Sequence, residues 1–269
     1  AYITAEWHNN IIKIDTAGKA TVWANDNRDR GRNNGPVGEA TFKNPRDLVF
    51  DSQGNMFVLE NHSIRKIVFS GASAVVEDFV GNGDWGSEDG VGTAARFSEA
   101  WNLVIDPYDN IFFSDIHHNK IRMVTPDAVV TTIAGNGNWG YSDGLGENAR
   151  FRNPYGIALD SNSDILVNDT ENNRIRKIAI SRDSNGKVTA SNVSTLAGNG
   201  NYGTVNGTAD VAEFKRLEAM IVVNGVLYTY DRDESMFRQI LLNPVMTIPA
   251  GSNSATFNIS GTVSYTHLR

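Results

Sequence analysis

The feature that most constrains the fold of this chain is an internal repeat, whose landmarks recur every 54 to 63 residues. A phenylalanine that closes a glycine-rich stretch recurs at Phe42, Phe97, Phe151 and Phe214. Gly-Asn-Gly recurs at 81–83, 135–137 and 198–200, and Ile-Arg recurs at 64–65, 121–122 and 175–176. A unit of this length buries its apolar faces only against neighbouring copies, so the chain is predicted to have a repeat architecture.

Each repeat contains four short strand-like runs. In the third copy, apolar and β-branched runs at 103–105, 111–115, 121–124 and 129–133 alternate with turns rich in Pro, Asp and Asn. Four strands per repeat predict an all-β chain folded as a β-propeller of four-stranded blades. The predicted blades span about 1–41, 42–96, 97–150, 151–213 and 214–251, and the first of them lacks its first strand.

The fourth repeat carries a recognisable family pattern. Residues 153–160 (NPYGIALD), 165–169 (ILVND) and 172–178 (NNRIRKI) resemble an NHL repeat, in the form seen in bacterial surface and secreted proteins. The resemblance implies an NHL-type propeller over 1–243 with about five blades present of an expected six. Two copies depart from the pattern, because Ala100 replaces the usual Pro and 217–219 (LEA) replaces Pro-x-Gly.

Both ends of the chain are expected to be truncated. It starts Ala1-Tyr2-Ile3 inside a predicted strand, and its tail, 263–269, is interpreted as a sequencing-adapter scar. Residues 244–262 have two readings. They are either the fourth strand of blade five, at 245–248, with the start of a further blade, or the start of a β-sandwich module that resembles Calx-β.

Composition narrows the function. The formal net charge is −7, which disfavours a nucleic-acid partner, because phosphate binding needs a basic face. Cysteine is absent, so disulfides and thiolate chemistry are excluded. No apolar run is long enough for a membrane-spanning helix.

A residue type that recurs at one place in every blade is interpreted as scaffold, since a single ligand rarely needs every copy. This applies to the acids that end the second strands, which are expected to pair with the arginines of the third strands or to accept backbone N–H bonds of the following loop. The acids are Glu6, Glu60, Asp115, Asp169 and Asp231, and the arginines are Arg65, Arg122, Arg176 and Arg238.

The long loops between blades carry the candidate binding residues. Large amphipathic rings on an exposed rim are typical of binding surfaces. Trp85, Trp139 and Tyr202 recur at equivalent places, so packing between loops is the competing interpretation for them. A second position varies in chemistry from blade to blade, which suits recognition better, and it holds Arg46, Trp101, Tyr155 and Glu218.

A metal site is the weaker reading of the loops between second and third strands. His62, His117, His118 and the adjacent Asp115 are types that ligate zinc. These loops are predicted to face solvent, where a polar residue such as histidine is common without any metal.

The sequence therefore predicts a non-enzymatic recognition scaffold, whose loop face binds a protein or glycan partner. We expect no cofactor and no small-molecule substrate. An extracellular, cell-surface or periplasmic location is implied by the resemblance alone. The alternative is a metal-assisted hydrolase or lyase that acts at the mouth of the channel.

Overall fold

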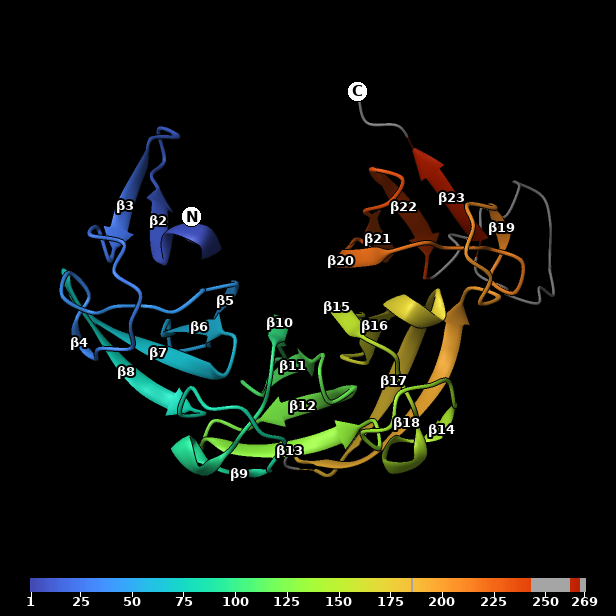
Figure 1. Cartoon of the computed structure of the whole chain (residues 1–269), viewed down its shortest axis with the longest axis horizontal. Helices are drawn as coiled ribbons and strands as arrows, with labels where there is room; N and C mark the ends of the chain where they lie inside the picture. The colour runs from blue at the N-terminus through green and yellow to red at the C-terminus, as the bar shows by residue number, and fades with distance from the viewer. Residues whose placement is uncertain (185, 243–261, 267–269) are drawn as a thin grey trace, which may run out of the picture.

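The protein is described from a computed structural model that covers residues 1–184, 186–242 and 262–266. It consists of five antiparallel sheets that follow one another along an arc, so the predicted all-β propeller of about five blades is confirmed (Figure 1). Short 3-10 turns at Glu6–His8, Gly92–Ala94, Gly146–Asn148 and Thr170–Asn172 are the helical elements of the described residues. No helix within those ranges is long and apolar enough to cross a bilayer.

Each sheet is one blade, and the strands follow the predicted rhythm. Blade one contains β1 (Tyr2–Ala5), β2 (Asn10–Ile14) and β3 (Ala20–Ala24). Blade two contains β4 (Gly35–Pro36), β5 (Asp47–Phe50), β6 (Met56–Glu60), β7 (Ser63–Ser70) and β8 (Ser73–Val80). Blade three contains β9 (Gly90–Val91), β10 (Ala100–Ile105), β11 (Ile111–Asp115), β12 (Lys120–Val124) and β13 (Val129–Ala134). Blade four contains β14 (Gly144–Leu145), β15 (Pro154–Leu159), β16 (Ile165–Asp169), β17 (Arg174–Arg182) and β18 (Val188–Ala197). Blade five contains β19 (Gly207–Thr208), β20 (Leu217–Val223), β21 (Val226–Asp231), β22 (Met236–Leu241) and β23 (Thr262–Thr266).

The sheets of blades two to five contain one strand more than the sequence analysis predicted. A two-residue strand from the loop that enters the blade pairs with the outermost long strand, as Gly90 does with Val130. Such a strand pairs part of an otherwise open sheet edge, where unpaired N–H and C=O groups would remain. Two residues are too few to give a hydrophobic alternation, so the sequence carries no signal for it.

The fourth position of blade five is taken by a strand from the last residues of the sequence. The strand that pairs with β22 on its outer side is β23, so Thr262–Thr266 takes the fourth position of this blade. Residues 245–248, which one of the two readings assigned to that position, lie outside the described residues, as does nearly all of 244–262. The proposed origin of 263–269 as an adapter scar stays a prediction.

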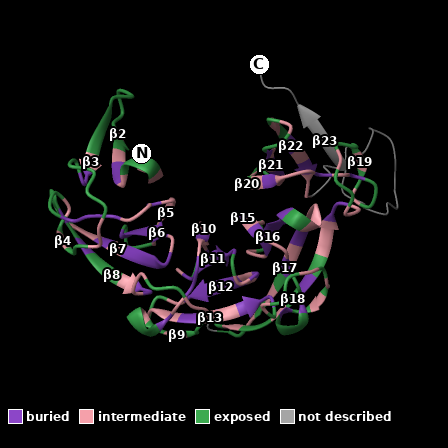
Figure 2. Ribbon diagram, viewed as in Figure 1, coloured by how far each residue is buried: buried purple, intermediate pink, exposed green. Residues whose placement is uncertain are grey.

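The core lies between consecutive blades, where the sheets face each other (Figure 2). The landmark phenylalanines belong to it, and Phe42, Phe97, Phe151 and Phe214 are all 0% exposed. In blade three, for example, the rings of Phe97 and Phe113 lie 4.6 Å apart, centroid to centroid. The recurring Phe is therefore a packing residue, which explains why it recurs in every interval.

The Gly-Asn-Gly motifs are required by a close backbone approach. Gly198 has a φ of +104°, and a Cβ there would come 2.6 Å from the carbonyl oxygen of Asn173. Only glycine tolerates both the left-handed backbone and the missing space. The motif thus holds the long loop against the loop between the second and third strands.

The paired acids and arginines are scaffold, as predicted. The arginine side chains of the third strands are completely buried: Arg65, Arg122, Arg176 and Arg238. In blade four, Arg176 Nη1 donates to Asp169 at 2.7 Å, and Asp143 contacts the same guanidinium from the long loop. The acids also accept backbone N–H bonds, but from the loop that enters the blade and not from the following loop as expected. Asp169, for instance, accepts from the N–H of Arg152 at 2.7 Å.

Candidate functional site

Side chains from the position of the repeat that varies in chemistry between blades form a row along the inner rim of the loop face. The guanidinium of Arg46 lies over the indole of Trp101, 4.3 Å from the ring centroid. The Trp101 ring meets Tyr155 edge to face at 5.1 Å between centroids. Three residues separated by more than fifty positions each thus form one continuous contact across three blades. The structure thus brings into contact three side chains that occupy the same position in consecutive repeats.

The fourth member of that position, Glu218, lies in the next blade and carries two ion pairs. Its Oε1 is 2.8 Å from Arg232 Nη1 and 3.1 Å from Arg216 Nε. The side chain of Glu218 is only 16% exposed. This carboxylate raises the pKa of Arg232, and the charge of Asp233 acts in the same direction. The row therefore continues into blade five as a charged cluster.

The three repeated rings of the long loops remain exposed. Trp85, Trp139 and Tyr202 have exposed fractions of 63%, 65% and 62%. Each also packs one side against a neighbouring loop. Arg152 lies 4.7 Å from the centroid of Trp139, and Lys215 lies 5.3 Å from that of Tyr202. Loop packing and accessibility thus coexist, because each ring contacts a neighbouring loop and still keeps more than 60% of its surface exposed.

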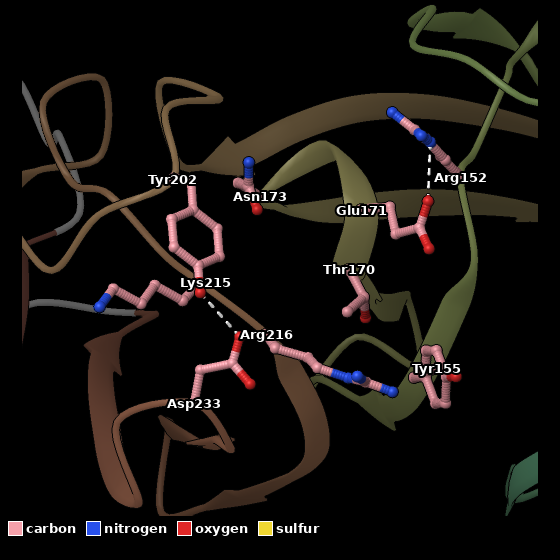
Figure 3. Close-up of a pocket in the computed structure, with 9 residues that line it drawn as sticks. All are labelled: Arg152, Tyr155, Thr170, Glu171, Asn173, Tyr202, Lys215, Arg216 and Asp233. Atoms are coloured by element: carbon pink, nitrogen blue, oxygen red, sulfur yellow. Dashed lines mark hydrogen bonds and ion pairs between the residues drawn. The ribbon is translucent and has the colours of Figure 1, made fainter.

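A pocket opens between blades four and five on the same face, with a volume of about 300 Å³ (Figure 3). It includes the predicted Tyr155 and Tyr202. The residues that complete its lining were not among the predicted site residues, and they are Arg152, Thr170, Glu171, Asn173, Lys215, Arg216 and Asp233. The volume is at the lower end of the range of small-ligand sites.

The polar groups of the pocket are held in place by one another. Tyr202 donates its hydroxyl hydrogen to Asp233 at 2.8 Å, and this hydrogen bond raises the pKa of Tyr202. Glu171 is fixed by Arg152 at 2.8 Å and by the side-chain amide of Asn153 at 2.6 Å. Groups that are already oriented lose little conformational entropy on binding. The pocket is therefore preorganised for a polar ligand.

The candidate metal residues are not brought into one group. His118 bonds Asp115 at 2.9 Å, while Asp115 also pairs with the buried Arg122. His117 instead pairs with Glu99 at 2.6 Å, and its ring lies 4.8 Å from that of Trp85. Within the described residues, no three His, Cys, Asp or Glu side chains cluster as metal ligands would.

His62 also packs against Trp85, with 5.3 Å between ring centroids. Burial lowers its pKa, which favours the neutral ring. His62 and His117 therefore support the exposed indole from two blades.

Sequence reasoning also missed Trp7, which is 91% exposed in the 3-10 turn of blade one. The sequence could have indicated Trp7, because it lies in the loop between the second and third strands, on the same face as the other candidate residues. Arg152 and Lys215 had a signal too, because each directly follows a landmark Phe. Asp233 had none, since only the tertiary contact with Tyr202 distinguishes it.

Comparison with known proteins agrees with the fold. No family model matches the chain. NHL repeat-containing protein 2 of Bos taurus is 29% identical over 175 residues, which is 59% of this chain and 24% of that protein. The chloroplastic protein SUPPRESSOR OF QUENCHING 1 of Arabidopsis thaliana is 29% identical over 105 residues, or 39% of this chain and 10% of that protein. The matches thus span a quarter or less of these relatives.

Among solved structures, an auxiliary nutrient binding protein from Bacteroides thetaiotaomicron superposes with a TM-score of 0.58 at 16% identity. The match covers 88% of this chain and 57% of that one. At this identity the likeness concerns the fold alone. The repeat pattern and the five sheets show that the chain is a β-propeller, and its sequence is similar to NHL repeat-containing protein 2.

Proposed function

We propose that this chain is a non-enzymatic recognition scaffold, whose loop face binds a protein or glycan partner outside the cytoplasm. The observation that carries the proposal is the row formed by Arg46, Trp101 and Tyr155, flanked by exposed rings. Aromatic and arginine side chains dominate the energetics of binding surfaces. Here they stand on blades whose facing sheets share buried hydrophobic cores, which supports a rigid surface.

The chemistry of the rim supports binding over a reaction. The ion pairs at the rim join residues that fix one another, as in Arg46 with Glu6 at 3.1 Å. Loops on a rigid framework vary freely and are the usual place for recognition. The location outside the cytoplasm rests on the resemblance to surface and secreted NHL arrays and is part of the proposal.

The test uses a double variant, Trp101→Ala with Tyr155→Ala. Partners are first identified with the wild-type protein on a glycan array and in a screen of purified extracellular proteins. Affinity for each partner is then measured by calorimetry, and a loss of tenfold or more is expected, because each truncated aromatic anchor costs about 1–2 kcal/mol or more.

Tyr108→Ala is the matched control. Tyr108 is 53% exposed, but it lies in the turn between β10 and β11, at the opposite end of the blade. The proposal fails if the rim variant binds every identified partner as well as the wild type does. Stoichiometric zinc or calcium in the purified protein would instead favour the hydrolase or lyase alternative.

A further inference from the structure

We propose that the pocket between blades four and five binds a carboxylate-bearing sugar unit of an acidic glycan, and that Arg216 receives the carboxylate. This inference rests on the proposed recognition function and assigns one ligand class to one part of the loop face. Four observations support it: a guanidinium end without a partner, a local excess of positive charge, preoriented hydroxyl-binding groups and an exposed ring.

The first observation concerns the guanidinium of Arg216. Its Nε is paired with Glu218 at 3.1 Å, and the side chain is 43% exposed. Within the described part of the chain, its two terminal nitrogens have no hydrogen-bond partner. Figure 3 shows this side chain extending from the segment before β20 toward Tyr155, which also lines the pocket. A free planar fork matches the two oxygens of a carboxylate, and such pairs form strong bidentate hydrogen bonds.

The local charge points to a single negative charge on the ligand. Glu218 is shared by Arg216 and Arg232, so two cations face one carboxylate at this end of the pocket. Each of the other two cations of the lining forms an ion pair with one acid: Lys215 pairs with Glu234, and Arg152 pairs with Glu171. Asp233 also lines the pocket. Among the lining residues, three are cations, Arg152, Lys215 and Arg216, and two are acids, Glu171 and Asp233, and this difference of one positive charge suits a monoanionic carboxylate. A phosphate dianion would bring a second negative charge close to Glu171 and Asp233 in this small pocket, and the added repulsion disfavours it.

The remaining groups are those that recognise sugar hydroxyls. Thr170 and Asn173 are held by hydrogen bonds to Leu217 O at 2.5 Å and Gly200 O at 3.1 Å, which leaves their oxygens as acceptors in the lining. Asp233 and Glu171 add carboxylate acceptors of fixed orientation. A hydroxyl both donates and accepts, so a polyhydroxylated ring can satisfy such a mixed set.

The ring of Tyr202 provides the apolar contact. It is 62% exposed, with Lys215 near one side, and its hydroxyl is tied to Asp233. Sugar rings have an apolar C–H face that stacks on such rings. A peptide carboxylate would use Arg216 equally well. A peptide carboxylate would not need the exposed Tyr202 ring together with several oriented hydrogen-bond acceptors. The lining therefore favours a glycan.

The experiment uses tetragalacturonic acid and its fully methyl-esterified form as probes. The two share every ring and free hydroxyl and differ only in the masked carboxylates. Calorimetry with the wild-type chain is expected to show binding of the acid, weakening with added salt, and affinity for the ester reduced about tenfold or more. This comparison needs no variant, so it does not depend on whether a substitution perturbs folding.

Arg216→Gln removes the fork and is expected to reduce affinity for the acid by a similar factor. Arg28→Gln is the matched control, because Arg28 is exposed on a long loop of blade one, away from the pocket. Equal binding of acid and ester, or unchanged affinity in Arg216→Gln, would overturn the assignment. Tighter binding of tetra-aspartate than of the acidic sugar would also overturn it, in favour of a peptide carboxylate.

Failure of this inference is separable from failure of the proposed function. If no uronate binds, but the Trp101 and Tyr155 double variant loses another identified partner, the recognition role stands and only the ligand assignment is wrong. If the uronate binds in the pocket while the double variant keeps every other partner, the rim does not act as proposed.

Discussion

The guanidinium of Arg46 in blade two lies over the indole of Trp101 in blade three, 4.3 Å from the ring centroid. The two residues come from equivalent positions of consecutive repeats. Arg46 is nearly buried, with 8% of its side chain exposed, because Glu6 of blade one and the carbonyl oxygen of Ala100 also hold it. One side chain thus joins three blades, and the contact belongs to both the scaffold and the candidate surface.

Replacing Arg46 by Met should therefore destabilise the fold by about 1–3 kcal/mol, since it removes the charge-assisted hydrogen bonds from Arg46 to Glu6 and to the carbonyl oxygen of Ala100. The measurement is urea unfolding followed by circular dichroism. Arg28→Met is the control, because Arg28 is exposed, and its effect should stay within about 0.5 kcal/mol. Equal stability of the two variants would contradict a structural role for Arg46.

Removal of one buried arginine should be more costly. Arg122 and Asp115 are both completely buried and 2.9 Å apart. Arg122→Met leaves the Asp115 carboxylate without its main partner, and about 3–5 kcal/mol of stability should be lost. Adding Asp115→Asn should recover part of this loss, because the uncompensated charge is gone. A double-mutant cycle in urea measures the coupling, and strictly additive losses would contradict it.

Stability should depend on the ionisation of Asp169. Burial raises the pKa of Asp169 to about 6, and the guanidinium of Arg176 offsets only part of this rise. The folded protein then holds the proton more tightly than the unfolded chain does. The stabilisation is fully present below the unfolded pKa of 3.8 and is lost as pH rises through about 6.

The free energy of unfolding of the wild type, taken relative to Asp169→Asn, should thus fall by about 2–3 kcal/mol between pH 4 and pH 7. The asparagine variant lacks the titration but keeps the shape, so the difference isolates this group. Denaturant unfolding at several pH values measures it. A difference that grows with pH would mean that the Arg176 pairing outweighs burial.

The loop glycines offer a test of the close approach. Gly198→Ala introduces a Cβ at 2.6 Å from Asn173 O in a left-handed backbone, whereas Gly18→Ala has the same kind of backbone, φ +81°, and open space. Gly18→Ala should cost about 1 kcal/mol from backbone strain alone. Gly198→Ala should cost clearly more, measured by thermal unfolding. Equal shifts in Tm would show that the loop relaxes freely.

Much of the fold could be predicted because the repeat constrains it locally. The landmark Phe97 and its equivalents, the strand alternation and the Asp-Arg pairs all recur, and recurrence identifies packing positions without any knowledge of their partners. The short strand at Gly90–Val91 and the strand at Thr262–Thr266 were not foreseen. Both depend on a partner edge elsewhere in the sheet and have too little local pattern of their own.

The sequence by itself determined the blade rhythm, the buried faces and the position of the repeat that differs between blades, because these follow from periodicity along one chain. The tertiary structure alone decided that Arg46 stacks on Trp101, that Trp101 meets Tyr155, and that Arg216 reaches the same region as Tyr202 and Asp233. The first two contacts join residues of different blades, and their geometry is set by how sheets pack face to face. The third joins segments of blade five and of the loop that enters it. No spacing in the sequence encodes that packing.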